Sequence, residues 1–215
     1  SNGHPAVTKL FVAQPYGLFC WDYDDSTRYN AFNSKLTNGR LLANKLSCGI
    51  DSGFNYGTET RMSAYGLEYD GHNAREVLFN SSGDLHIGVG SLGNYDIIWS
   101  GVNSGQLTDE RTVVKYIPSD TLKQHLANPD AEPLDWTDNT TIPLLARGLR
   151  NACGLALDAS DVVWCVNQGG DTHDPSGISG PYSEPFWNSN PACTLYRLAR
   201  ENSNKRYGFP FGFIT

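Results

Sequence analysis

Three short polar segments of this sequence carry side chains that could do chemistry. One of them offers a general base, and a second offers a pair of side chains that could bind a ligand. His72 lies in YDGHNAREVLF, just ahead of a run of apolar residues, and an imidazole there can act as a general base because its pKa lies near working pH. Arg150 and Asn151 stand together in ARGLRNACGLALD and offer a forked cation and an amide, a pair suited to carboxylate or carbonyl oxygens. A structural histidine, and an ordinary salt bridge with a turn, are the alternatives.

The third segment, VNQGGDTHDPSG, is suited to a hard cation. Gly169 and Gly170 let the backbone come close to a ligand. Their carbonyl oxygens, with the carboxylates of Asp171 and Asp174, are of the kind that calcium prefers. The segment therefore predicts a calcium loop, with a flexible Gly/Asp turn as the alternative.

Composition narrows the classes of function. The 215 residues carry a formal net charge of -7, whereas nucleic-acid-binding proteins gather Lys and Arg on one face, so we expect no nucleic-acid partner. No stretch approaches the roughly 18 uninterrupted apolar residues of a membrane span, so we expect no membrane insertion. The Walker loop, the GxSxG elbow, the HExxH helix and the dinucleotide GxGxxG are absent, which argues against the common nucleotide-dependent and hydrolytic enzymes.

Five cysteines stand without any CxxC spacing, which favours disulfides over zinc or a dithiol redox motif. Cys153 and Cys165 end the run CGLALDASDVVWC, which is typical of strand, turn and strand, so a bridge across the two strands is geometrically reasonable. Asn80 and Asn139 begin the N-x-S/T sequons NSS and NTT, which fit the same oxidising setting. We therefore expect a secreted protein.

The elements that must position these side chains are almost all short strands, separated by clusters of Gly, Asn, Asp and Ser. One helix is expected, in SDTLKQHLA, with Ser119 or Asp120 capping its first turn. A two-strand phrase occurs twice, as REVLFNSSGDLHIGVGSLGN and as GLALDASDVVWCVNQGGD. The pattern predicts an all-β fold, either a β-propeller, whose loops gather at one mouth, or a β-sandwich.

The chain reads as a single domain over residues 1–215. A propeller blade takes roughly 40 to 50 residues, so the chain is expected to hold a partial set of about three to four blades. The remaining blades would come from a missing segment or from a second chain.

Four segments follow one another in a specific order: GHNAREVLFNSSGDLHIGVGSLGN, RNACGLAL, NQGGD and YGFP. In that order they resemble the pyrroloquinoline-quinone-dependent glucose/sorbosone dehydrogenase family, including its fungal pyranose dehydrogenase branch, over about residues 70 to 213. The resemblance implies a six-bladed β-propeller with pyrroloquinoline quinone (PQQ) over its mouth, bound through Ca²⁺. It also implies an oxidoreductase that moves hydride from the anomeric carbon of an aldose or pyranose to PQQ and passes the electrons to an external quinone, heme or dye.

Each polar segment receives a role from this resemblance. His72 would take the proton of the sugar hydroxyl beside the cofactor. Arg150 and Asn151 would contact the quinone, with Arg150 stabilising the charge that builds on its oxygen. Calcium would be held by the backbone carbonyls of Gly169 and Gly170, with Asp171 beside them, and would polarise the quinone carbonyl.

Two other functions stay open. Bacterial members of the family carry an Asp that orients the catalytic histidine where this chain has Ser91. That departure favours a non-catalytic extracellular propeller of the same family, acting in protein or carbohydrate recognition. A weaker alternative is a calcium-dependent lactonase, to whose metal site Asp96, Asp171 and Asp174 could contribute.

Overall fold

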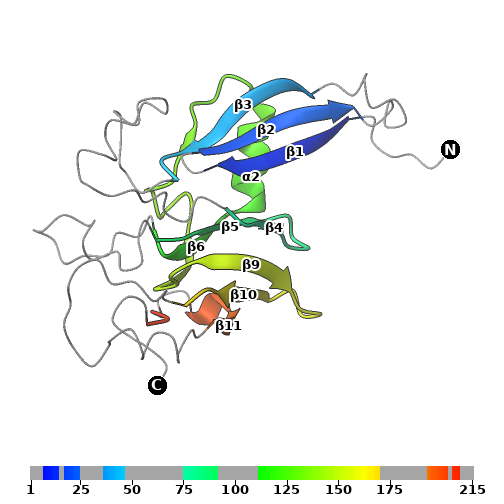
Figure 1. The fold of residues 1–215 in the computed structure, drawn as a ribbon. Helices are drawn as coiled ribbons and strands as arrows, with labels where there is room; N and C mark the ends of the chain where they lie inside the picture. The colour runs from blue at the N-terminus through cyan, green and yellow to red at the C-terminus, as the bar shows by residue number, and fades with distance from the viewer. Residues whose placement is uncertain are drawn as a thin grey trace, which may run out of the picture.

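The computed structural model describes residues 7–14, 17–24, 36–46, 75–91, 111–169, 193–202 and 205–208. These residues form three sheets, the helix α2 (Ser119–Ala127) and the short 3-10 helix η3 (Arg200–Asn202) (Figure 1). No helix in the described ranges is long and apolar enough to cross a membrane. The predicted all-β class is confirmed, and the architecture is that of part of a propeller-like domain.

The sheets follow one another along the chain, except that the short strand β7 returns to the first sheet. The first sheet has the order β1 (Val7–Gln14), β2 (Gly17–Asp24), β3 (Leu36–Asn44) and β7 (Leu134–Asp135). The middle sheet has the order β4 (Val77–Phe79), β5 (Leu85–Val89), β6 (Val113–Ile117) and β8 (Leu144–Arg147). The last sheet has the order β11 (Thr194–Leu198), β10 (Val163–Asn167) and β9 (Ala152–Leu157). Neighbouring strands are antiparallel except β3 and β7, and small antiparallel sheets of this kind are typical of propeller blades.

The middle sheet lies between the other two, as Figure 1 shows. Its strand β5 is covered on both faces, and all five residues of that strand are buried. Leu85 and Ile87 belong to a hydrophobic core shared with the first sheet, whereas Val114 belongs to a second core shared with Ala152 and Cys165 of the last sheet. Face-to-face stacking of successive small sheets favours the propeller over the β-sandwich.

The helix α2 has the predicted bounds, but its predicted cap is wrong. Pro118 occupies the N-cap position, and no side-chain hydrogen bond from that position caps the helix. Instead, the amide of Ser119 donates to Oδ1 of Asp84 at 2.8 Å, so a carboxylate from the β4–β5 turn serves this helix end. A negative charge is favourable there because the helix N-terminus carries partial positive charge.

The predicted bridge between Cys153 and Cys165 is wrong, since both thiols are free. The register pairs Cys165 with Leu155, and a β-bulge leaves Cys153 without an opposite residue on β10. Cys165 is buried between two sheets, where desolvation raises the pKa of its thiol to about 12, while Cys153 is exposed. The other described cysteines, Cys20 and Cys193, are free as well, and Cys48 lies outside the described residues.

Candidate functional site

The segment that carries Arg150 and Asn151 connects β8 of the middle sheet to β9 of the last sheet. Two backbone hydrogen bonds tie it to the middle sheet. The Leu149 amide donates to the Thr112 carbonyl at 3.0 Å, and the Ser91 amide donates to the Arg150 carbonyl at 2.7 Å. Ser91 follows β5 and Thr112 precedes β6, so two strands of the middle sheet fix the backbone of this segment.

Asn151 is held from the other direction by the end of β10. Its backbone amide donates to Oδ1 of Asn167 at 3.0 Å, and its side-chain Nδ2 donates to Oε1 of Gln168 at 3.0 Å. Its carbonyl accepts from the Gln168 amide at 2.9 Å, and Asn167 donates onward to the hydroxyl of Thr194 at 3.3 Å. Asn151 and Asn167 are both buried, and the bond from the Asn151 amide to Asn167 is shielded from water, so it holds the Asn151 backbone firmly in place.

The guanidinium of Arg150 reaches the glycine-rich segment. Its Nη1 donates to the carbonyl oxygen of Gly169 at 2.7 Å, and the residue is only 1% exposed. A fixed, buried cation stabilises negative charge on a group beside it with little reorganisation. The antiparallel pairing of β9 and β10 therefore brings Arg150, before β9, to Gly169, after β10.

The contact between Arg150 and Gly169 tests whether the donors present suit calcium and a quinone. A backbone carbonyl oxygen has two lone pairs and the guanidinium uses one, so the Gly169 oxygen keeps an acceptor site that a cation can share. The forked N–H donors of Arg150 suit adjacent carbonyl oxygens such as those of a quinone. The chemistry of this donor set fits both groups.

Five candidate site residues lie outside the described residues, so their roles stay predictions: His72, Asp96, Gly170, Asp171 and Asp174. The beginning of the YGFP segment is described. The amide of Tyr207 donates to the carbonyl of Arg147 at 2.9 Å, which brings the last segment of the resemblance to the start of the Arg150 segment.

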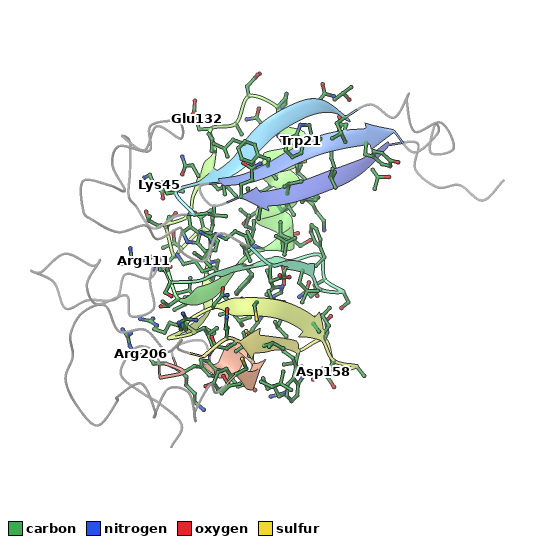
Figure 2. The ribbon with its side chains drawn as sticks, viewed as in Figure 1. Trp21, Lys45, Arg111, Glu132, Asp158 and Arg206 are labelled. Carbon is green, nitrogen blue, oxygen red and sulfur yellow. The ribbon has the colours of Figure 1, made fainter. Side chains whose placement is uncertain are left out.

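The ends of the strands that carry these residues face one side of the molecule. Figure 2 shows Arg111, the neighbour of Thr112, and Arg206, the neighbour of Tyr207, on one side of the stacked sheets. Asp158, in the turn between β9 and β10, lies on the opposite side. Loops from the middle and last sheets thus gather at one end, as expected of propeller blades.

Asn167 is a site residue that sequence reasoning missed. Its only signal in the sequence is its place directly before Gln168 and Gly169. Its importance lies in the bond to the amide of Asn151, 16 residues earlier in the chain, which no local pattern reveals.

Comparison with known proteins gives a likeness in structure alone. No family model matches the chain, and no curated protein matches it. Among solved structures, the chain is similar to a calcium structure of the Trichoderma reesei Carbohydrate-Active Enzymes Family AA12, with a TM-score of 0.61 at 18% identity, over 94% of this chain and 41% of that one. The iodide structure of the same protein gives 0.60 at 18% identity, over 94% and 40%.

A second kind of neighbour is the holo form of the pyranose dehydrogenase PQQ domain from Coprinopsis cinerea. The TM-score is 0.59 at 20% identity, over 97% of this chain and 42% of that one. The chain therefore spans about two fifths of the length of these solved structures. Its fold is that of a part of the domain found in the AA12 protein and in this PQQ domain.

Proposed function

We propose that the chain is part of an oxidoreductase that oxidises the anomeric carbon of a sugar, with PQQ as the acceptor and Ca²⁺ beside it. One observation carries the proposal. Nη1 of Arg150 lies 2.7 Å from the carbonyl oxygen of Gly169, so the expected quinone contact and the expected calcium ligand share one place. The likeness to a calcium structure of the AA12 protein and to a holo PQQ domain supports the same function.

The described residues have tasks that follow from their chemistry. Arg150 carries a guanidinium that burial holds in place, so it stabilises negative charge on an acceptor oxygen. Asn151 presents an amide whose orientation Gln168 fixes. The Gly169 carbonyl contributes a ligand to the cation. PQQ, when bound, supplies the two-electron redox chemistry.

The remaining tasks fall to residues outside the described ranges. In this proposal His72 takes the proton of the sugar hydroxyl as a general base. Gly170 and Asp171 add oxygen ligands for Ca²⁺. Electrons leave to an external quinone, heme or dye, and the protein works outside the cell.

Binding is the first test of this function. The purified protein that contains this chain with all the blades of its propeller is titrated with PQQ, with and without Ca²⁺, while the visible absorption of the quinone is recorded. We expect the binding of PQQ to depend on Ca²⁺ and to be weaker in the Arg150→Met variant. We also expect that variant to lose about 10²-fold or more of the rate of sugar-dependent dye reduction. Arg197→Met, on the exposed part of β11, is the matched control. No PQQ binding by the wild-type protein with all its blades present, or equal behaviour of the two variants, contradicts the proposal.

A second candidate function is recognition without catalysis, and Ser91 favours it. Ser91 stands where the resemblance expects an orienting carboxylate. It is buried beside the site, and its amide donates to the Arg150 carbonyl. His72→Ala separates the two candidates. It abolishes dye reduction in an enzyme, whereas a recognition module binds its protein or carbohydrate partner unchanged.

A further inference from the structure

The two N-x-S/T sequons occupy different kinds of structure, and the difference leads to an inference beyond the proposed function. We propose that Asn139 accepts an N-linked glycan when the chain passes through a eukaryotic secretory pathway, and that Asn80 does not.

Asn139 is exposed in the turn that connects β7 to β8. The preceding residue, Asp138, builds this turn. Its carboxylate accepts from the amide and the hydroxyl of Thr140 at 2.9 and 2.6 Å, and from the hydroxyl of Thr141 at 2.6 Å. Hydrogen bonds from Thr140 and Thr141 lower the pKa of Asp138 to about 2, so the carboxylate stays ionised and the turn stays closed near neutral pH.

The same turn is anchored in the core, while its tip faces solvent. The amide of Ile142, which is fully buried, donates to the Asp138 carbonyl at 2.9 Å. In the described part of the chain no hydrogen bond involves the side chain of Asn139. A group added to that side chain therefore stands in solvent and displaces nothing.

Asn80, in contrast, uses both ends of its amide to close the turn 80–84. Its Oδ1 accepts from the Asp84 amide at 2.8 Å, and its Nδ2 donates to Oδ2 of Asp84 at 3.0 Å. Asp84 is buried, accepts from the Ser119 amide and pairs with Arg200. A sugar on Nδ2 of Asn80 would replace one amide proton and crowd this buried carboxylate, so a chain modified there could not form the folded turn.

The modification forms one covalent bond to the side-chain amide. Nδ2 of the asparagine loses a proton and bonds to the anomeric carbon of an oligosaccharide, while the lipid diphosphate that carried the oligosaccharide leaves. The co-reactant is therefore a lipid-linked oligosaccharide, and no oxidant or reductant takes part.

Site mapping of the secreted chain tests the inference. The 215-residue chain, behind a secretion leader, is produced in a eukaryotic host and recovered from both medium and cells. Digestion by a peptide N-glycosidase in heavy-oxygen water converts each glycosylated asparagine to a labelled aspartate, which peptide mass spectrometry locates. We expect the label at Asn139 and none at Asn80.

Two variants make the test symmetrical. Asn139→Gln is expected to abolish the mass of the glycan. Ser82→Ala, an exposed change that destroys the Asn80 sequon but leaves the Asn80 side chain in its turn, is expected to change nothing. Label at Asn80 in the wild-type chain, or an unmodified Asn139 in the recovered protein, overturns the proposal.

Discussion

Two hairpins of this protein, β4–β5 in the middle sheet and β9–β10 in the last sheet, are built on the same turn. In each, the first turn residue donates its amide to the carbonyl four residues on: Asn80 to Asp84 at 3.1 Å, and Asp158 to Val162 at 3.0 Å. The side-chain Oδ1 of the first residue accepts from the amide of that same partner, at 2.8 Å and 3.1 Å. The phrase that repeats in the sequence therefore repeats in the hydrogen bonding.

The fourth position of both turns has a positive φ, 84° at Gly83 and 62° at Asp161. Glycine adopts this conformation freely, whereas Asp161 bears a cost of roughly 1 kcal/mol. The carboxylate of Asp161 accepts from the amide and the hydroxyl of Ser81 in the other turn, at 2.9 and 2.8 Å. The less favourable residue thus joins the two turns.

The fifth position separates the hairpins. Asp84 is buried and binds Asn80, the start of α2 and Arg200, while its counterpart Val162 makes no such connection. The strands that follow differ in the same way, because β5 is buried throughout and β10 leaves Val166 43% exposed. One local turn therefore supports two tertiary roles, according to what packs against the sheet.

At their other ends the two hairpins hold the same segment. Ser91, after β5, bonds to the carbonyl of Arg150, and Asn167, at the end of β10, bonds to the amide of Asn151. The candidate site is thus clamped between neighbouring blades. If the comparison is right, substitutions at the fifth turn position or at Asn167 lower the free energy of unfolding strongly. Substitutions at the exposed parts of the turns change it little.

The largest effect is expected from Asp84→Ala. Loss of a buried carboxylate that accepts from Ser119, Asn80 and Arg200 should lower the free energy of unfolding by about 3 kcal/mol. Val162→Ala, at the equivalent turn position, should cost under about 1 kcal/mol. Urea denaturation followed by circular dichroism measures both, and equal losses would show that the fifth position has no special role.

Asn167→Ala comes next. It leaves the buried Asn151 amide without its acceptor, which should cost about 2 kcal/mol. Hydrogen exchange of that amide should quicken, whereas the Gln168 amide, which bonds to the Asn151 carbonyl, should keep more of its protection. Asn167→Asp keeps an acceptor and serves as the control. An unchanged exchange rate of the Asn151 amide in Asn167→Ala would show that Asn167 does not hold this segment.

Gly83→Ala is expected to cost about 1.5 kcal/mol. The φ of this residue is positive, a conformation that alanine adopts unfavourably, and the added Cβ would lie 2.9 Å from the hydroxyl oxygen of Ser119. Combining it with Ser119→Ala should recover the part of the loss that comes from this contact. A double variant no more stable than Gly83→Ala would leave backbone conformation as the whole explanation.

Acid should weaken the middle hairpin through Asp84. Burial by itself raises the pKa of this carboxyl, but hydrogen bonds from Ser119, Asn80 and Arg200 outweigh it, so the pKa lies below its usual value. A carboxyl with a lowered pKa stabilises the fold fully above the ordinary Asp pKa, and that stability is lost as the pH falls below about 4. The gap in unfolding free energy between wild type and Asp84→Asn should narrow from pH 6 to pH 3. A gap that stays constant would contradict this assignment.

The smallest effect is expected for the link between the turns. The bonds from Ser81 to Asp161 are exposed, so a double-mutant cycle of Ser81→Ala and Asp161→Ala should give a coupling of about 0.5 kcal/mol. Asp161→Gly alone should be close to neutral, since the relieved positive φ offsets the lost bonds. A coupling above about 2 kcal/mol would make this contact a main tie between the blades.

Sequence alone predicts the strands, the helix at 119–127 and the repeated hairpin, because each depends on residues within a few positions of one another. It also singles out Arg150, Asn151 and Gly169 by type and order. Its errors lie in the helix cap and in the strand register. The helix is capped by Asp84 from 35 residues upstream, and the expected Cys153–Cys165 bridge fails because the register places Leu155, not Cys153, opposite Cys165.

Only tertiary structure decides which of these residues meet. The bonds from Arg150 to Gly169 and from Asn151 to Asn167 span 19 and 16 residues, and both exist because β9 and β10 pair antiparallel in the last sheet. The bond from Ser91 to Arg150 then joins the middle sheet to this end of the hairpin. The physical reason is burial. Stacking the middle sheet between two others removes apolar surface from water, and that packing brings Ser91 and Thr112 of the middle sheet to the segment that precedes β9.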